Sequence, residues 1–338
     1  MREFFSGIWR LLVLGAAAIL PAAVLLMPAK AWSEAEAALR VTPTTTVSTT
    51  ATTGAEPTAL AAFEQTPAIP TAAPIPPKKA GGGTVVEELV GGGEKLADNL
   101  TYKNRDELSV DFAAFLKKKP KTVLKKTTEP QVLILHTHAT ETYMHYYAGY
   151  YNDGDMGRST DTSQNVAVAG EALAAALRAK GVGVIHDTTL HDDPQYVGAY
   201  GRSAETSEAI RKRYPSIKLV IDVHRDAVQR SDTVAVKPTV TMDGETYAQM
   251  MLVVGAEDSA DNPNKNRDEN VTMALALQRE LQTVVPGIMR PISFCACEYN
   301  QSYFPGFLVE VGAQANTFEE AERSAAVLGE AIATVLGE

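Results

Sequence analysis

From about residue 131 onward, short apolar runs alternate with amphipathic segments, and this pattern predicts strands that alternate with helices. The predicted strands cover residues 132–135, 182–186, 219–223, 234–240, 247–254 and 307–311. The predicted helices cover residues 163–180, 203–214, 269–284 and 317–336. This order is typical of an α/β domain, so we expect a mostly parallel sheet flanked by helices.

Local signals support several of these boundaries. The first helix places Leu173 and Leu177 on one stripe and ends near Gly181. The last helix begins with Thr317 followed three residues later by Glu320, which is a capping-box arrangement. The dipeptide 243–244 is Asp-Gly and lies between two predicted strands, so it predicts a hairpin added to the sheet.

The N-terminus carries an uncharged run over residues 11–29. At ~1.5 Å per residue a helix of this length crosses most of a ~30 Å hydrocarbon core. Arg2 and Arg10 precede the run, as the positive-inside rule requires. We expect a membrane anchor, and the alternative is a signal peptide removed after Ala31. In either case the rest of the chain is exported.

A Thr-, Ala- and Pro-rich stretch follows and contains almost no charge between residues 42 and 77. Such a composition buries too little apolar surface to order itself, so it predicts a spacer, which the glycine triplets 81–83 and 91–93 extend. A short helix is expected between residues 103 and 126, with Phe112 and Phe115 on one face. We therefore divide the chain into an anchor or signal (1–31), a linker (32–100), a helical lead-in (101–129) and a catalytic domain (130–338).

Composition narrows the possible functions. The chain of 338 residues has a formal net charge of −10, which disfavours nucleic-acid binding because phosphates require a basic surface. It contains two cysteines, too few for a disulfide scaffold or a Cys-rich zinc module. Neither a Gly-x-Ser-x-Gly elbow nor a Walker loop is present in the sequence.

The ionisable side chains that suggest chemistry follow the predicted strands directly. His136, His138 and Glu141 come after the first strand, His224 follows a second, and Glu310 lies in the last. Polar groups at the ends of very apolar strands are costly unless a partner or a metal satisfies them. Histidines and one carboxylate can hold a catalytic zinc ion that keeps one position open, and Glu310 is then the candidate general base. The alternative is that the histidines only bond loop backbone.

Several separate motifs, taken together and in this order, resemble the stage II sporulation protein P family. The similarity covers about residues 130–338, and the linker contributes nothing to it. The motifs are residues 136–143 (HTHATETY), 158–161 (RSTD) leading to Asn165, 185–187 (IHD) with His191, 222–226 (DVHRD), and 310–312 (EVG) with Asn316.

That family in turn is similar to zinc-dependent N-acetylmuramoyl-L-alanine amidases. The resemblance implies zinc ligands at His136 or His138 and at His224, an acidic ligand at Glu141 or Asp161, and catalysis by Glu310. We take Glu141 as the acidic ligand and keep Asp161 as the alternative. The resemblance also implies peptidoglycan as substrate, and a lytic transglycosylase of the stage II sporulation protein D type as partner during engulfment.

The sequence therefore predicts a membrane-tethered, extracytoplasmic zinc hydrolase that cleaves the amide between N-acetylmuramic acid and L-alanine. Arg225 is expected to help stabilise the oxyanion, and the alternative for it is an ion pair with Asp222 or Asp226. Two other functions stay open at this point. One is an endopeptidase that cuts the cross-links of the same polymer, and the other is a non-catalytic wall-binding module.

Overall fold

A computed structural model of the chain describes residues 74–260, 263–297 and 299–338. The expected anchor or signal at residues 1–31 lies outside these residues, as does most of the expected linker. Among the helices in the described part, none is long and apolar enough to cross a membrane.

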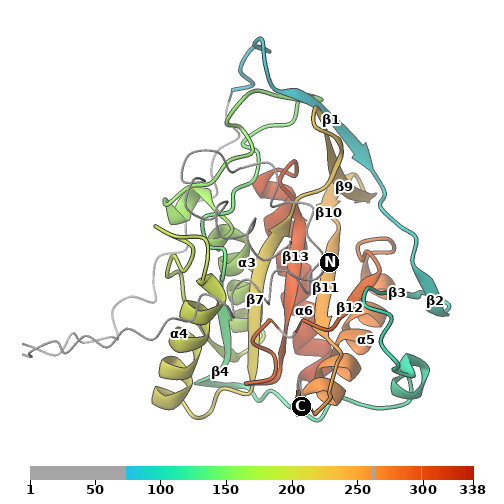
Figure 1. The fold of residues 1–338 in the computed structure, drawn as a ribbon. Helices are drawn as coiled ribbons and strands as arrows, with labels where there is room; N and C mark the ends of the chain where they lie inside the picture. Colours follow the sequence, from blue (N-terminus) through green and yellow to red (C-terminus); the bar gives the residue numbers. More distant parts are fainter. Residues whose placement is uncertain (1–73, 261–262, 298) are drawn as a thin grey trace, which may run out of the picture. The chain divides into compact units, whose positions relative to one another are not determined.

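The larger sheet has eight strands and carries the candidate site. Within it, β13, β7, β4 and β6 run parallel to one another, and β11, β12 and β3 form a second parallel block. The two blocks meet at the antiparallel pair β11–β13, and β2 is an antiparallel edge strand. Figure 1 shows β7 and β13 side by side in this sheet. The order is β2 (Glu94–Ala97), β3 (Leu100–Asn104), β12 (Ile292–Cys295), β11 (Met250–Gly255), β13 (Gly306–Ala313), β7 (Leu219–Asp226), β4 (Thr127–Leu135) and β6 (Val182–His186).

A second sheet adjoins the first. Its order is β10 (Glu245–Ala248), β9 (Val234–Met242), β1 (Gly83–Glu88) and β5 (Tyr150–Tyr151), and β8 (Gln229–Ser231) also pairs with β9. The expected hairpin is confirmed, because β9 and β10 pair on either side of Asp243 and Gly244. Both turn residues have positive φ, at 52° and 84°, as a tight two-residue turn requires.

Within the part of the chain that the structure describes, four α-helices cover the larger sheet unequally. Helices α3 (Ala167–Ala179), α5 (Arg267–Val284) and α6 (Phe318–Leu336) share one apolar core with one face of the strands. Helix α4 (Ala199–Arg213) packs on the opposite face, where Ile210 contacts a smaller cluster that includes Leu133 and Leu135. The capping box of α6 is confirmed at Thr317 and Glu320.

The alternation of side chains along the strands decides which polar groups meet. On β7, Ile221 and Val223 belong to the core under α3, α5 and α6, so Asp222 and His224 point to the α4 face. On β13, Val309 and Val311 belong to that same core, so Glu310 also points to the α4 face. Asp222 and His224 of β7 and Glu310 of β13 therefore all lie on the α4 face of the sheet.

The structure differs from the sequence-based expectation in three segments. Strands β1, β2 and β3 lie within residues 83–104, where a glycine-rich spacer and lead-in were expected. Their pairing partners β9 and β12 are distant in the sequence, so the local composition does not reveal them. The division of the chain into domains otherwise stays a prediction.

The short helix expected between residues 103 and 126 is one 3-10 turn, η2 (Phe112–Phe115), although Phe112 and Phe115 are buried as expected. The strand expected over residues 247–254 is two strands, β10 and β11, in different sheets. Gln249 lies between them, and its side chain accepts a hydrogen bond from the backbone N–H of Val90 (2.6 Å) and donates one to the carbonyl of Gly287 (2.8 Å).

Candidate metal centre

The candidate site lies at the carboxyl ends of three adjacent parallel strands, β4, β7 and β13. Open α/β sheets place their ligands at this edge. Leu135 at the end of β4 is in register with Asp222, and His224 is in register with Glu310 on β13. Side chains in register on parallel neighbours share a face, so His224 and Glu310 are adjacent.

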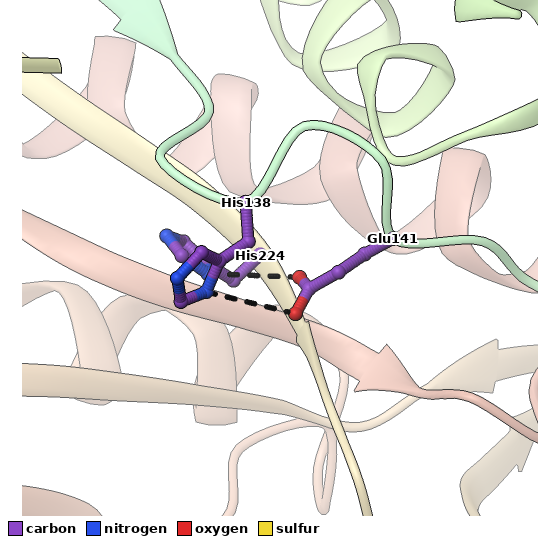
Figure 2. Close-up of side chains that lie close together, drawn as sticks. All are labelled: His138, Glu141 and His224. Carbon is purple, nitrogen blue, oxygen red and sulfur yellow. Dashed lines mark ion pairs between the residues drawn. The ribbon is translucent and has the colours of Figure 1, made fainter. Parts of the chain in front are cut away.

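Three side chains converge there from two parts of the chain. His138 and Glu141 come from the loop after β4, and His224 comes from β7, as Figure 2 shows. The distance from His138 Nδ1 to Glu141 Oε1 is 3.9 Å, and that from His224 Nδ1 to Glu141 Oε2 is 3.6 Å. All three residues are buried, with exposed fractions of 9%, 6% and 3% for His138, Glu141 and His224.

This group fits a zinc ion in both donors and spacing. Two imidazoles and one carboxylate form a ligand set typical of catalytic zinc, which leaves a position for water. Tetrahedral ligands at ~2.0–2.1 Å from zinc are roughly 3.3 Å from each other, and the 3.6 and 3.9 Å separations are close to this value and too long for good hydrogen bonds. One ligand atom from each of the three residues lies within 4.8 Å of the other two, so the group could hold one metal ion.

The electrostatics of the group favour a positive charge. Burial lowers the pKa of His224, but the carboxylates of Asp222 and Glu141 outweigh burial and raise it well above its usual range. Burial likewise raises the pKa of Glu141, yet His224, Arg225 and His138 outweigh it and hold that pKa at about 2. A cation at this point is therefore stabilised by charges that the fold has already buried.

The carboxylate of Asp222 contacts the ring of His224 on the side away from Glu141. Its Oδ1 lies 2.9 Å from His224 Nε2, a close contact outside hydrogen-bond geometry, which leaves Nδ1 facing Glu141. Asp222 in turn accepts hydrogen bonds from Thr137, through the backbone N–H (2.8 Å) and the hydroxyl (2.6 Å). A carboxylate behind a histidine is the usual way in which a metal-ligating ring is oriented.

Arg225 contacts the loop of Glu141 rather than an open site. Its backbone N–H donates to Glu141 Oε2 (3.1 Å), and its Nε donates to the carbonyl of Thr142 (2.9 Å). Neither expected ion pair of Arg225, with Asp222 or Asp226, is present among the described contacts. Asp226 instead pairs with Arg290 at 2.6 Å.

Glu310 lies beside His224, because the two residues are in register on β13 and β7. Its Oε2 is buried and makes no hydrogen bond within the described residues. Burial, and after it the neighbouring carboxylate of Asp226, raise the pKa of Glu310 to about 8. A carboxyl with such a pKa exchanges protons near neutral pH, as a catalytic acid and base must.

His136 and Asp161 lie outside the group of three. Both ring nitrogens of His136 are engaged, Nδ1 with the carbonyl of Val223 (2.8 Å) and Nε2 with His186 Nε2 (2.9 Å). Asp161 caps the 3-10 turn η3 (Thr162–Gln164), and its carboxylate bonds Ser163 there. Of the alternatives that the sequence left open, the structure brings together His138 and Glu141.

Sequence reasoning assigned no role at the site to several residues that line it. Tyr196 stacks on the ring of His138, with centroids 4.3 Å apart. Arg158 Nη2 lies 3.9 Å from Glu141 Oε1. For Asp222 a signal did exist, because it precedes His224 by two residues in a strand and so must share its face. Tyr196 follows no periodic segment, and no sequence pattern indicates it.

The family model of stage II sporulation protein P matches residues 90–333, and the chain belongs to this family. A search of the curated proteins finds no match.

Several of the solved structures that show some likeness to this chain are amidases. They include the N-acetylmuramyl-L-alanine amidase Ami1 from Mycobacterium smegmatis, at 16% identity over 62% of this chain and 98% of that chain, with a TM-score of 0.37. The CwlD amidase from Clostridioides difficile, solved with the GerS lipoprotein, matches at 16% identity over 61% of this chain and 98% of that chain, with a TM-score of 0.36. The N-acetylmuramoyl-L-alanine amidase AmiC2 of Nostoc punctiforme matches at 11% identity over 62% and 97%, with a TM-score of 0.35.

Proposed function

We propose that the chain is a zinc-dependent hydrolase that cleaves the amide between N-acetylmuramic acid and L-alanine in peptidoglycan. The observation that carries this proposal is the buried group His138, Glu141 and His224 with Glu310 in register beside it. Membership of the stage II sporulation protein P family supports peptidoglycan as the substrate and sporulation as the setting.

In this proposal His138, Glu141 and His224 hold the zinc ion. When bound, zinc supplies a Lewis acid that polarises the scissile carbonyl and acidifies water. Glu141 would contribute the negative charge of the ligand set, and Asp222, beside His224 Nε2, would orient this ring and leave its Nδ1, which faces Glu141, for the ion.

Glu310 transfers a proton from the attacking water to the leaving amine. Its carboxylate accepts a proton from the attacking water and then donates it to the nitrogen of the leaving amine. Arg225 holds the loop of Glu141 through Thr142, so we assign it a positioning role in place of the oxyanion contact expected from the sequence.

The setting of the enzyme is part of the proposal. An N-terminal span within residues 11–29 would tether the domain outside the cytoplasmic membrane. A lytic transglycosylase of the stage II sporulation protein D type is the proposed partner, because removal of stem peptides and cleavage of glycan strands are complementary steps.

The test measures zinc content and product identity on the full-length protein with purified peptidoglycan. We expect about one zinc per chain and release of free stem peptides, identified by mass spectrometry. Glu310→Gln should retain zinc and lose most of the turnover, by about 10²–10⁴-fold for a general base. His138→Ala should lose the zinc, whereas His145→Ala is a matched control, because His145 is exposed.

Other outcomes separate the alternatives. Resolved cross-links without free stem peptides would identify an endopeptidase. A folded protein that binds peptidoglycan without zinc and without product would identify a wall-binding module. Full activity in Glu310→Gln would remove Glu310 from its assigned role.

A further inference from the structure

Arg158 lies directly beside the candidate metal ligand Glu141. The chain returns from the second sheet so that residues 158 and 159 run antiparallel to residues 140 and 141. Glu141 and Arg158 form a β-bridge, and the backbone N–H of Ser159 donates to the carbonyl of Thr140 (2.8 Å). The position of Arg158 is therefore fixed by the same backbone that positions the ligand.

One side of the guanidinium is anchored. Arg158 Nη1 lies 2.5 Å from Asp192 Oδ2 and 3.0 Å from the hydroxyl of Thr140. The carboxylate of Asp192 is fully buried and also accepts from the hydroxyl of Thr140 (2.6 Å). This arrangement holds the guanidinium in one orientation before any ligand arrives, which lowers the entropic cost of binding.

The other side of the guanidinium is open. The side chain of Arg158 is 43% exposed, and within the described residues neither Nε nor Nη2 makes a hydrogen bond. Nη2 is 3.9 Å from Glu141 Oε1, so the free donors border the reaction site. A planar pair of donors in this position matches a carboxylate, which it can bind in a bidentate way.

Tyr196 continues this surface towards His138. Its ring lies under the guanidinium of Arg158, at 4.9 Å, and stacks on the ring of His138 with an interplanar angle of 21°. Tyr196 is 43% exposed and the neighbouring Val197 is 51% exposed. An exposed aromatic ring beside a fixed cation suits a ligand that is apolar on one part and anionic on the next.

We propose that Arg158 and Tyr196 form a recognition shelf that selects a peptide carboxylate next to the scissile amide. This inference rests on the proposed function and specifies the part of the substrate that the site recognises. One arginine, already paired with Asp192, suits a single carboxylate. A polyphosphate ligand is disfavoured, because the chain has a net charge of −10.

The experiment compares two substrates on the zinc-loaded full-length protein. One is a muropeptide with free peptide carboxylates, and the other is the same muropeptide with these carboxylates amidated. Wild type should prefer the free carboxylates. Arg158→Gln should lower kcat/KM on that substrate by about 10–100-fold, as expected for hydrogen bonds to a charged group, mainly through KM. On the amidated substrate the change should be less than about twofold.

Matched variants and measurements of zinc content distinguish recognition of the carboxylate from positioning of Glu141. Arg158→Lys keeps the charge without the planar pair of donors and should fall between wild type and Arg158→Gln. Arg279→Gln, at an exposed position on α5, should behave as wild type. An equal loss on both substrates, or a loss of zinc from Arg158→Gln, would overturn the proposal, because Arg158 would then only position Glu141.

Failure of the proposed function gives a different result. If wild type with bound zinc hydrolyses neither substrate, the amidase assignment fails. The shelf is then judged by calorimetric titration of the two muropeptides into wild type and Arg158→Gln. Binding that depends on both the carboxylates and Arg158 supports the shelf, and binding that depends on neither overturns it.

Discussion

Glu141 is the residue at which the contacts of the site converge. Its carboxylate faces His138 and His224 and accepts a hydrogen bond from the backbone N–H of Arg225. Its carbonyl accepts a hydrogen bond from Val166 at 2.7 Å, next to the start of α3. A buried carboxylate held on so many sides keeps its charge and its direction, which are the properties that a metal ligand needs.

Substitutions of Glu141 and Asp161 should therefore show which of the two carboxylates binds zinc. Glu141→Gln keeps the size of the side chain and removes its charge, and we expect it to weaken zinc binding by more than the roughly 10–100-fold that loss of an outer partner costs. Asp161→Asn is the matched control and should retain zinc, since the carboxylate of Asp161 accepts its hydrogen bonds from Ser163 and Gln164 of its own turn. Competition with a zinc indicator measures both. Retained zinc in the first and lost zinc in the second would reverse the assignment.

The sequence predicted the residue types of the site and left two choices open. Alternation along β4 accounts for the position of His136, because Ile134 faces the core under α3 and Leu135 faces α4. His136 continues the first series and meets His186, on the face away from His224. His138 has the same parity as His136, and the turn over residues 137–140 carries it to His224. The side on which His136 lies could have been read from the sequence if the facing of β4 had been known. The position of the loop at Glu141 could not, because it depends on contacts with Arg225 and Val166.

At the scale of elements, α3 approaches the end of β4 through a glycine. A Cβ at Gly170 would lie 2.6 Å from His136 Nε2 and 2.6 Å from His186 Nε2. His186 also contacts Glu171 of α3, with Nδ1 2.8 Å from Oε2. The helix can therefore sit this close to the histidine pair only where it lacks a side chain.

Two glycine substitutions test this packing. Gly170→Ala should lower the free energy of unfolding by about 1–3 kcal/mol, because the methyl group forces the histidine rings apart. Gly201→Ala, also in a helix, meets nothing within 4 Å and should stabilise by about 0.5–1 kcal/mol. Urea unfolding measures both. Equal effects at the two positions would contradict a steric role for Gly170.

Helix α6 carries a carboxyl group whose titration affects stability. Burial raises the pKa of Glu322 to about 7, and Glu319 one turn earlier raises it as well. Because the folded-state pKa lies above the ordinary value, the folded protein prefers the protonated form of this carboxyl group. The contribution of Glu322 to the free energy of unfolding is therefore fully present below pH ~4.5 and is lost as the pH rises through about 7. Glu322→Gln should thus be more stable than wild type at pH 8, by about 1 kcal/mol after solvent screening. Thermal unfolding at pH 4 and pH 8 checks this, and a difference of equal size at both values would refute it.

The elements of residues 130–338 were largely predictable, and those before them were not. Strands such as β6 and β13 and helices such as α5 and α6 have apolar periods that the sequence displays. Strand β1 instead depends on backbone pairing with β9, and β3 on pairing with β12. Short strands flanked by glycines have no period long enough to read, so only the tertiary partners define them.

At the scale of the whole molecule, the site joins distant parts of the chain. His138 and Glu141, then His224, then Glu310 come from three separate strand ends and meet only when the sheet is formed. No short spacing pattern could therefore identify the site. It also follows that an ion bound by the first three residues stabilises the folded chain, since the unfolded chain offers no such site.

Removal of zinc should lower the thermal stability of the whole domain. At a free zinc concentration about 1,000 times Kd, binding adds about 4 kcal/mol to the free energy of unfolding. Chelation should thus lower Tm by several degrees, and added zinc should restore it. Glu141→Gln is the control whose Tm should not respond to the chelator. A wild-type Tm that also fails to respond would argue against zinc at this position.

The pairing of β4 has a consequence for insertions and deletions rather than substitutions. Before Val132 its register with β6 is already broken twice, so one residue more or less there can be absorbed in a bulge. From Val132 it is paired without interruption, to β6 as far as Ile134 and to β7 as far as Leu135. A change of length in that stretch would turn each following side chain to the opposite face and remove His138 from the ligand group. Length variation among related chains is therefore expected before Val132 and not between Val132 and His138.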